Sequence, residues 1–581
     1  MKIRLHAVMA ACVVVVFLPN LPYWSTAAIG GAGTDALKHV WSQWWVLTRL
    51  MQDGTLPLEA TLIHHPLGGA FFSVDTLNAL IGLPLRAVAG PVATYNVVLL
   101  LDLVLATWAA AALARSLGVG AWASGLAGVG WVLSAWVLAF PLGSGVSETA
   151  LFFLLPLVLL CVQRTLRGPG WVAPVLASVL LAAQGLGCWS HGITAAVLVA
   201  GGGAVWLWQR PWQQQQGSLY ALDRGAWLRI GLGLGVLAAL VVPTYLAVSG
   251  TLGDGNAIKA REISVFGASI LGPLDLPETN SMALLDFFLP GTWGLREGGP
   301  GAEQLYYASY LGLGLLGLAL VALRRGGRLE RRLLLAVLGM ALLAMGPRIY
   351  LDHGRTLLAI PNPLYLLLHA VFPLFSATLH SVDRLALGAQ LALAILAARG
   401  LDTLMADRAK PQRLALLAMV VVGGEALVVS PGPWPLAMSA ATPHPASEAL
   451  AETPGPGAVL DLPFVETRAG GSRFAGDIFF QQTIHGRPIP FQLEGREEGS
   501  LSPPVRANPF YRGMARVLLE GRTGPDGCEG VQGLSHLGFR AVVWRPELAS
   551  ADQRAVLEPH LERCLGEGRN LSGRLIFDLG D

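Results

Sequence analysis

The residues best suited to chemistry lie in a segment that follows the first apolar run of the chain. Thr34 and Asp35 open this segment, which keeps helical spacing as far as about Gln52. Its polar face carries Asp35, Lys38, His39, Ser42 and Arg49, and its other face carries Trp41, Trp44, Trp45 and Met51. We expect such a helix to lie in the membrane interface, with its Trp side chains at headgroup depth. Asp35, at the positive end of the helix dipole, could then act as a general base at the membrane surface.

A structural interpretation of the same segment stays open. Asp35 then only favours the start of the helix, with Thr34 as the N-cap, and the Trp side chains form an ordinary aromatic belt. The local sequence does not exclude this alternative.

Two further candidates lie at the mouths of apolar runs. Glu148 borders a span, where an acidic side chain is a functional candidate, although a solvated cap residue fits the pattern equally well. His191 lies with Ser190 in a very short turn between two apolar runs. It could contact a substrate or make a structural hydrogen bond.

Basic residues also gather in a later connection between spans. Arg348, His380 and Arg384 are the most suggestive of them, because the orientation argued below places them outside, against the usual bias of positive charge. Anion or phosphate binding would explain them, since the guanidinium fork matches phosphate oxygens. By contrast, the adjacent His64 and His65 precede a Pro-Leu-Gly-Gly stretch and are interpreted as a surface turn rather than a metal site. The five cysteines show no metal-binding spacing.

The elements that must hold these residues are membrane spans. The chain is 53% hydrophobic and only 13% charged, with a mean hydropathy of +0.54, which lies outside the soluble range. Eleven apolar runs predict an all-α polytopic bundle. They are 7–19, 92–114, 121–140, 151–162, 172–187, 193–208, 230–248, 307–323, 333–345, 385–398 and 414–429. The first resembles a signal peptide, and we interpret it as an uncleaved span.

The orientation follows from the distribution of basic residues. They collect in alternate connections, namely at 2–4, 115, 164–167, 210–229, 324–332 and 399–413. These connections should be cytoplasmic, which places the N-terminus inside. The large loops 26–90, 249–306 and 347–384, and everything after 430, should then lie outside.

Residues 431–581 form a second predicted domain. They contain 32 charged residues in 151, against 46 in the preceding 430. Short β-like runs at 458–462, 541–544 and 574–579, with a helical stretch at 551–565, predict a small extracytoplasmic α/β unit. Cys528 and Cys564 could form a disulfide there, although the sequence does not establish that they approach one another.

Several motifs, taken in order, resemble the GT-C glycosyltransferase superfamily. They are Asp35 in the first outer loop, His-Pro-Leu-Gly-Gly-Ala-Phe-Phe at 65–72, Leu77-Asn78, Leu-Asp-Phe-Phe-Leu-Pro at 285–290, Phe375 to Arg384, Val-Leu-Asp-Leu-Pro-Phe at 459–464 and Gln481 to Pro488. The branch resembled is a prokaryotic one with a C-terminal extracytoplasmic domain.

The resemblance implies a fold and an activity. Members use an essential acidic residue in the first outer loop and polyprenyl-phosphate sugars as donors, and they transfer the sugar on the outer face of the membrane. Asp35 matches that acidic position, and Glu148 corresponds to a second acidic group. This chain departs from the pattern in two places, because no second acidic residue accompanies Asp35 and His380 stands where relatives tend to have an Arg before Arg384.

The leading hypothesis is therefore an inverting glycosyltransferase of a bacterial inner membrane. Asp35 would accept the proton of an acceptor hydroxyl with help from Glu148, while Arg384, with Arg348 or His191, neutralises the leaving lipid phosphate. His380 and His39 complete the candidate substrate-binding or phosphate-binding set.

The partners implied are a lipid-linked sugar donor, membrane lipids and an envelope glycan, lipid or protein acceptor. A net charge of +2 gives no indication of nucleic acid, no cofactor is assigned, and a divalent metal stays an open alternative. The rival hypothesis is a non-enzymatic envelope transporter or assembly factor on a GT-C-like scaffold. The scarcity of ionisable residues within the spans argues against an ion-coupled pump.

Overall fold

The protein is described by a computed structural model. It describes residues 2–55, 57, 59–70, 75–215, 224–253, 281–289, 308–352, 358–371, 381–463, 471–491, 501–520 and 528–579. The outer loop 249–306 and part of the loop 347–384, including His380, therefore lie largely outside the described residues.

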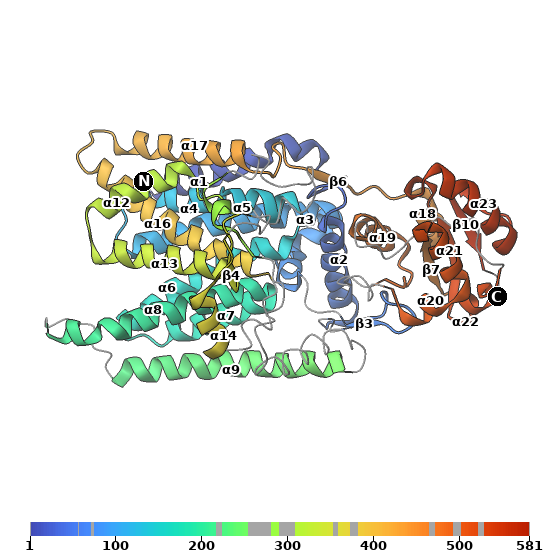
Figure 1. Ribbon diagram of the computed structural model, residues 1–581, viewed down its shortest axis with the longest axis horizontal. Coiled ribbons are helices and arrows are strands. Elements are labelled where there is room, and N and C mark those ends of the chain that lie inside the picture. The colour runs from blue at the N-terminus through green and yellow to red at the C-terminus, as the bar shows by residue number, and fades with distance from the viewer. Residues whose placement is uncertain are drawn as a thin grey trace.

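The membrane part is a bundle of apolar helices (Figure 1). They are α1 (Lys2–Phe17), α3 (Thr76–Ser116), α4 (Ala121–Val132), α5 (Ala135–Val137), α6 (Leu154–Arg167), α7 (Val172–Gly187), α8 (Trp189–Gln215), α9 (Arg224–Gly253), α12 (Leu313–Arg324), α13 (Arg328–Ala344), α14 (Pro363–Val371), α16 (Ala386–Met405) and α17 (Pro411–Val429). Short 3-10 helices are η1 (Leu18–Tyr23), η3 (Ser147–Phe153), η4 (Leu284–Phe287) and η6 (Val382–Leu385), and η2 (Leu138–Gly143) is a π-helix.

The prediction of a polytopic helix bundle is confirmed. Each of the eleven predicted runs contains a helix, and in the described part of the chain seven helical segments are long and apolar enough to cross a membrane. The helices α7 and α12 are apolar but shorter. The chain is a multi-pass membrane protein, while the count of eleven spans stays a prediction.

Helix α16 forms the centre of the bundle. Its Ala and Leu side chains are almost all buried, and it packs against α4, α12 and α13. Small residues let these backbones approach, as in other membrane bundles. A Cβ added at Gly400 would lie 1.8 Å from the carbonyl oxygen of Leu318, and one at Gly128 would lie 2.3 Å from that of Thr107.

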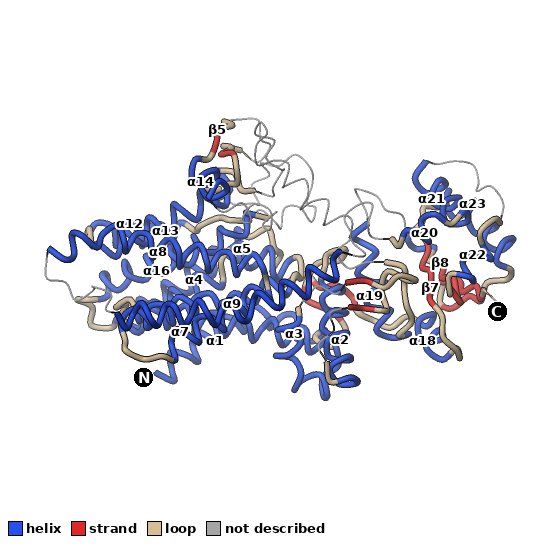
Figure 2. Tube along the Cα trace, turned by 90° about the horizontal axis from the view of Figure 1, so that it is seen from below, coloured by secondary structure: helices blue, strands red, loops and turns tan. Residues whose placement is uncertain are grey.

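The two ends of the bundle differ in character. The N-terminus lies at one end, and the C-terminal domain lies beyond the other (Figures 1 and 2). At the N-terminal end, Arg399 bonds Glu330 at 2.5 Å and the Leu117 carbonyl oxygen at 3.3 Å. Asp402 there accepts a hydrogen bond from the Gly120 amide. Three of the connections predicted to be cytoplasmic thus meet at one end.

The C-terminal domain is a small α/β unit, as predicted. Its four-stranded sheet has the order β7 (Ala458–Leu462), β8 (Phe539–Trp544), β10 (Arg574–Asp578) and β9 (Arg569–Leu571), with β7 and β8 parallel and the other pairs antiparallel. Around it lie α18 (Pro445–Glu452), α19 (Gly471–His485), α20 (Pro503–Ala507), α21 (Pro509–Glu520), α22 (Val531–His536), η7 (Pro546–Leu548) and α23 (Ala551–Leu565). Cys528 and Cys564 form a disulfide, with their Cα atoms 5.1 Å apart.

The loop 26–90 makes backbone hydrogen bonds to the segment after residue 430, and the domain boundary at 430 stays a prediction. Strand β1 (Ala27–Ile29) pairs with β6 (Met438–Ala440), and the hairpin β2 (Glu59–Ala60) and β3 (Gly69–Ala70) lies against the C-terminal domain. A further short strand pair, β4 (Arg348–Ile349) and β5 (Ile360–Pro361), is antiparallel. Helix α2 (Ala36–Asp53) crosses the end of the bundle and packs on α19 (Figure 1).

The aromatic face of α2 therefore does not lie in lipid headgroups, and that expectation is wrong. Trp41 and Trp45 are buried and share one hydrophobic core with α19 and the C-terminal sheet. The Trp41 ring lies 5.5 Å from that of Phe479 and stacks on Trp45 at 6.0 Å. Protein covers this face because burying a Trp side chain removes a large apolar area from water, whether the partner is lipid or protein.

The expectation that His64 and His65 form a surface turn is also wrong. His64 is buried, and the His65 Nε2 atom lies 2.7 Å from the Leu537 carbonyl oxygen. Both backbone amides donate to the Phe491 and Ile489 carbonyl oxygens of the C-terminal domain. This turn is thus part of the attachment of the first loop.

Candidate active site

Asp35 lies immediately before α2, in the N-cap position that the sequence gave to Thr34. Its carboxylate makes no capping hydrogen bond and instead accepts one from Lys38 Nζ at 2.7 Å. Thr34 donates its hydroxyl to the Gly31 carbonyl oxygen. With 29% of its side chain exposed, Asp35 has both a fixed partner and access to solvent.

Glu148 and Arg384 come together at the same end of the bundle. Glu148 lies in the first turn of η3, and Arg384 lies in η6, which leads into α16. An Arg384 guanidinium nitrogen and the Glu148 carboxylate are 3.8 Å apart, and the guanidinium also covers the Phe140 ring at 5.1 Å. Phe140 lies in the π-helix η2, an irregularity that is frequent at functional sites.

Close backbone packing joins the loop of Asp35 to the loop of Glu148. A Cβ on Gly30 would lie 2.7 Å from the Gly145 Cα, and one on Gly145 would lie 2.5 Å from the Ala36 Cβ. The Ile29 and Gly145 carbonyl oxygens lie 2.9 and 2.8 Å from the Tyr95 hydroxyl and share its single hydrogen. Two loops that are distant in sequence are thereby fixed side by side.

A buried carboxylate that the sequence reasoning missed completes the cluster. Asp75 is fully buried, and its Oδ2 lies 2.7 Å from the His39 Nδ1 atom and accepts a hydrogen bond from the Ser147 hydroxyl. Asn78 Nδ2 donates to its other oxygen at 3.0 Å. The only sequence signal was its position just before the Leu77-Asn78 motif.

The charges of these groups act on one another. Burial by itself would raise the pKa of Asp35, but the charge and hydrogen bond of Lys38 lower it below the usual value, with His39 and Arg384 contributing. Burial likewise lowers the pKa of His39, but the Asp75 carboxylate outweighs it, with Glu148 and Asp35 contributing, and raises this pKa to about 9. At neutral pH, Asp35 is therefore ionised and His39 is protonated.

His191 contacts the segment that carries Glu148. Its Nε2 atom lies 2.9 Å from the Thr149 carbonyl oxygen, next to Glu148, and its ring is fully buried against Trp136 and Phe152. This contact is the structural hydrogen bond that was one of its two predicted roles, and a contact with substrate stays a prediction. The hydrogen bond holds the segment that carries Glu148.

The structure does not bring all predicted binding residues together. Arg348 is exposed on β4, and no contact joins it to Glu148 or Arg384 in the part of the chain described. His380 lies outside the described residues. Their predicted roles therefore stay predictions.

The acidic side chains of the candidate site are paired with cationic partners. Across the described ranges, no group of three His, Cys, Asp or Glu side chains is arranged to hold a metal ion. Asp35 is bonded to Lys38, and Glu148 faces Arg384. These carboxylates are directed at cationic side chains.

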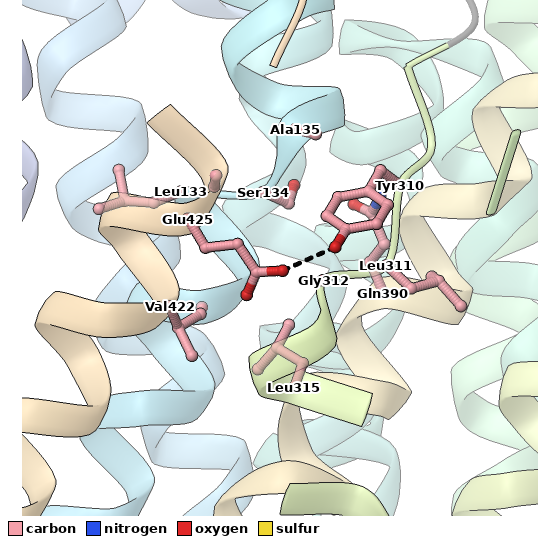
Figure 3. Close-up of a pocket in the computed structure, with 12 residues that line it drawn as sticks. Leu133, Ser134, Ala135, Tyr310, Leu311, Gly312, Leu315, Gln390, Val422 and Glu425 are labelled. Atoms are coloured by element: carbon pink, nitrogen blue, oxygen red, sulfur yellow. Dashed lines mark hydrogen bonds between the residues drawn. The ribbon is translucent and has the colours of Figure 1, made fainter. Parts of the chain in front are cut away.

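A small pocket within the bundle belongs to a separate structural feature (Figure 3). There Glu425 accepts hydrogen bonds from the Tyr310 hydroxyl at 2.7 Å, the Leu313 amide at 2.6 Å and the Gly314 amide at 2.9 Å. Glu425 thus caps the first turn of α12, which satisfies backbone donors that lipid could not.

Comparisons with known proteins identify the fold. No protein-family model and no curated protein sequence matches the chain. Among solved structures, all of this chain aligns with the arabinofuranosyltransferase AftD from Mycobacteria, with a TM-score of 0.58 and 18% identity. The chain spans 42% of the length of AftD.

Two further solved structures are less similar to the chain. The oligosaccharyltransferase of Archaeoglobus fulgidus in its apo form has a TM-score of 0.48 and 11% identity, over 94% of this chain and 69% of that protein. ArnT from Cupriavidus metallidurans, bound to undecaprenyl phosphate, has a TM-score of 0.35 and 15% identity, over 99% and 98%. On its helix arrangement and its similarity to AftD, the chain has the fold of the GT-C glycosyltransferase superfamily.

Proposed function

We propose that the chain is a membrane glycosyltransferase. It transfers a sugar from a polyprenyl-phosphate-linked donor to an envelope glycan, lipid or protein acceptor on the outer face of the membrane. The observation that carries the proposal is the convergence of Asp35, Glu148 and Arg384 from three separate segments at one end of the bundle. The AftD structure, which is named as an arabinofuranosyltransferase, supports the reaction class.

The proposed reaction is an inverting transfer. The acceptor oxygen forms a bond to the anomeric carbon of the donor, and the bond from that carbon to the phosphate oxygen breaks. The acceptor hydroxyl gives its proton to Asp35, which is ionised at neutral pH and accessible from outside. The phosphate leaves with the electron pair of the broken bond, and Arg384 neutralises its charge.

The location of the site fits a lipid-linked donor. Asp35 and Arg384 lie at the junction between the apolar bundle and the domain that contains the disulfide. A polyprenyl chain could remain among the helices while its sugar reaches the cluster. The disulfide supports an extracytoplasmic side, because disulfides persist in oxidising compartments.

The transporter or assembly-factor alternative explains less of the site. Such a function needs no carboxylate with external access next to a guanidinium, whereas glycosyl transfer from a phosphate needs both a base and a cation. The clustering therefore favours an enzyme.

The test is the variant Asp35→Asn in a deletion strain. The amide keeps the size of the side chain but cannot accept the proton, so transfer should fall by at least about 100-fold at normal abundance. Mass spectrometry of lipid extracts from the deletion strain, its parent and the complemented strains measures the product. The matched control is Asp53→Asn, at the far end of α2, where the exposed side chain pairs only with Arg49 in the ion pairs described.

Two outcomes would contradict the proposal. Undiminished product with Asp35→Asn at normal abundance would remove Asp35 from the mechanism. Identical glycolipid, glycan and glycoprotein profiles in the deletion strain and its parent would argue against a transferase and for the alternative.

A further inference from the structure

The His39 and Asp75 pair has the geometry of a buried ion pair that orients an imidazole. Only 7% of the His39 side chain and none of the Asp75 side chain is exposed. His39 Nδ1 is engaged by Asp75 Oδ2 at 2.7 Å, so Nε2, on the opposite edge of the ring, is the atom left for another partner.

Asp75 is itself fixed by its neighbours. Ser147 and Asn78 each donate a side-chain hydrogen bond to its carboxylate, and Asn78 also donates to the Ser147 carbonyl oxygen at 3.0 Å. Its backbone is in the left-handed region, with φ of 60°, which is uncommon for a residue other than Gly. Residues in such backbone conformations persist only where the surrounding contacts hold them, and they are frequent at active sites.

The pair also links the two sides of the candidate site. His39 lies in α2, one residue after Lys38, and Asp75 precedes α3. Ser147, which bonds Asp75, is the neighbour of Glu148. The groups that act on His39 through their charge are Asp35, Asp75 and Glu148, while Arg384 and Lys38 complete the charged groups of the cluster.

We infer that Asp75 is a positioning residue that fixes His39 as a cationic donor to the phosphate group of the sugar donor. This rests on the proposed function, and it adds a second cation, beside Arg384, to the site for the leaving phosphate. A carboxylate hydrogen-bonded to Nδ1 both sets the orientation of an imidazole ring and favours its protonated form. Nε2 then donates to a phosphate oxygen, and the positive charge stays within the site.

The experiment measures binding of a polyprenyl methyl phosphodiester to the full chain in nanodiscs of zwitterionic lipid. The single negative charge of this probe does not titrate near neutral pH. The wild-type affinity should change little between about pH 6 and about pH 8, because His39 stays protonated. In Asp75→Asn the charge partner is lost, so affinity should fall by about tenfold as the pH rises through about 6.5.

Two further variants separate orientation from folding. His39→Gln should bind weakly without this pH dependence, whereas Asp53→Asn should behave as wild type. A polyprenol without the phosphate group should bind all variants equally. Inorganic phosphate should compete only weakly, because it lacks the lipid chain.

The outcomes distinguish this inference from the proposed function. If Asp75→Asn binds the phosphodiester with the flat wild-type pH profile, or loses the same affinity at every pH, Asp75 has only a structural role and the inference is wrong. Wild-type binding with a preference over polyprenol would leave the proposed function standing in that case. If the folded wild-type chain shows no such preference at any pH, both are overturned.

Discussion

At the scale of single residues, the candidate site consists of three carboxylate and cation pairs. Asp35 is bonded to Lys38, Asp75 to His39, and Glu148 faces Arg384 at the longer distance of 3.8 Å. The Glu148 and Arg384 atoms are farther apart than those of the other two pairs, so we expect the phosphate of the proposed donor to compete with Glu148 for Arg384. Binding of the phosphate would also withdraw positive charge from Asp35 and make it a better base.

The His39 and Asp75 pair gives a pH dependence of stability. The folded-state pKa of His39 is raised from 6.5 to about 9, so its contribution is fully present below about pH 6.5 and is lost as the pH rises through about 9. That contribution is of the order of 3 kcal/mol at most.

Thermal unfolding in detergent should therefore show wild type losing more stability than His39→Gln between about pH 7 and about pH 10. Comparing the two curves removes the titration of other groups. Parallel curves would show that the ion pair contributes no net stability.

At the scale of elements, the site depends on the close approach of the two loops that carry Asp35 and Glu148. Gly145 has a φ of +67°, and a Cβ there would lie 2.5 Å from the Ala36 Cβ, one residue after Asp35. Only glycine satisfies both the left-handed backbone and the lack of space. A larger residue must displace the start of α2.

The variant Gly145→Ala should consequently lose most transfer activity, measured through the lipid-linked product. The matched control is Gly54→Ala, which has a φ of +68° but nothing within 4 Å of the added Cβ. Both variants incur a backbone cost of about 1 kcal/mol, but only the first moves Asp35. Equal activities would show that the spacing of the two loops is not important for the reaction.

At the scale of the whole molecule, the C-terminal domain and the first outer loop form one unit. The buried Trp41 of α2 packs against Phe479 of α19, and a Cβ on Gly476 of α19 would lie 3.4 Å from the Thr34 carbonyl oxygen. Arg545 and Arg574 hold α19 to the sheet through Asp477. The domain therefore forms part of the support for Asp35.

Trp41→Ala should weaken this unit by about 3 to 5 kcal/mol, the usual cost of removing a buried aromatic side chain. We expect limited proteolysis within the C-terminal domain to become faster and transfer activity to fall with it. Trp171→Ala, at a side chain that is 51% exposed, is the matched control and should change neither. Faster proteolysis with unchanged activity would show that the C-terminal domain does not support catalysis.

The sequence by itself determined the local features of this protein. Continuous apolar runs predicted the helices, because a span must satisfy its backbone within one segment. Alternation and turn residues located β7, β8, β10 and α23 within one or two residues. Asp35 stood out at the start of an amphipathic helix, in a position that the resemblance makes essential. Glu148 stood out as an acidic residue at the mouth of a span, and Arg384 as a basic residue in a connection predicted to lie outside.

Only the tertiary structure decided which distant groups meet. Nothing local distinguishes Asp75 from a solvated acidic residue, since its role comes from His39, Ser147 and Asn78, which other segments or the next helical turn supply. The aromatic face of α2 would suit lipid or protein equally, and only the position of Phe479 on α19 decides between them. Amphipathic patterning determines that a surface must be covered, but the partner depends on the packing of the whole chain.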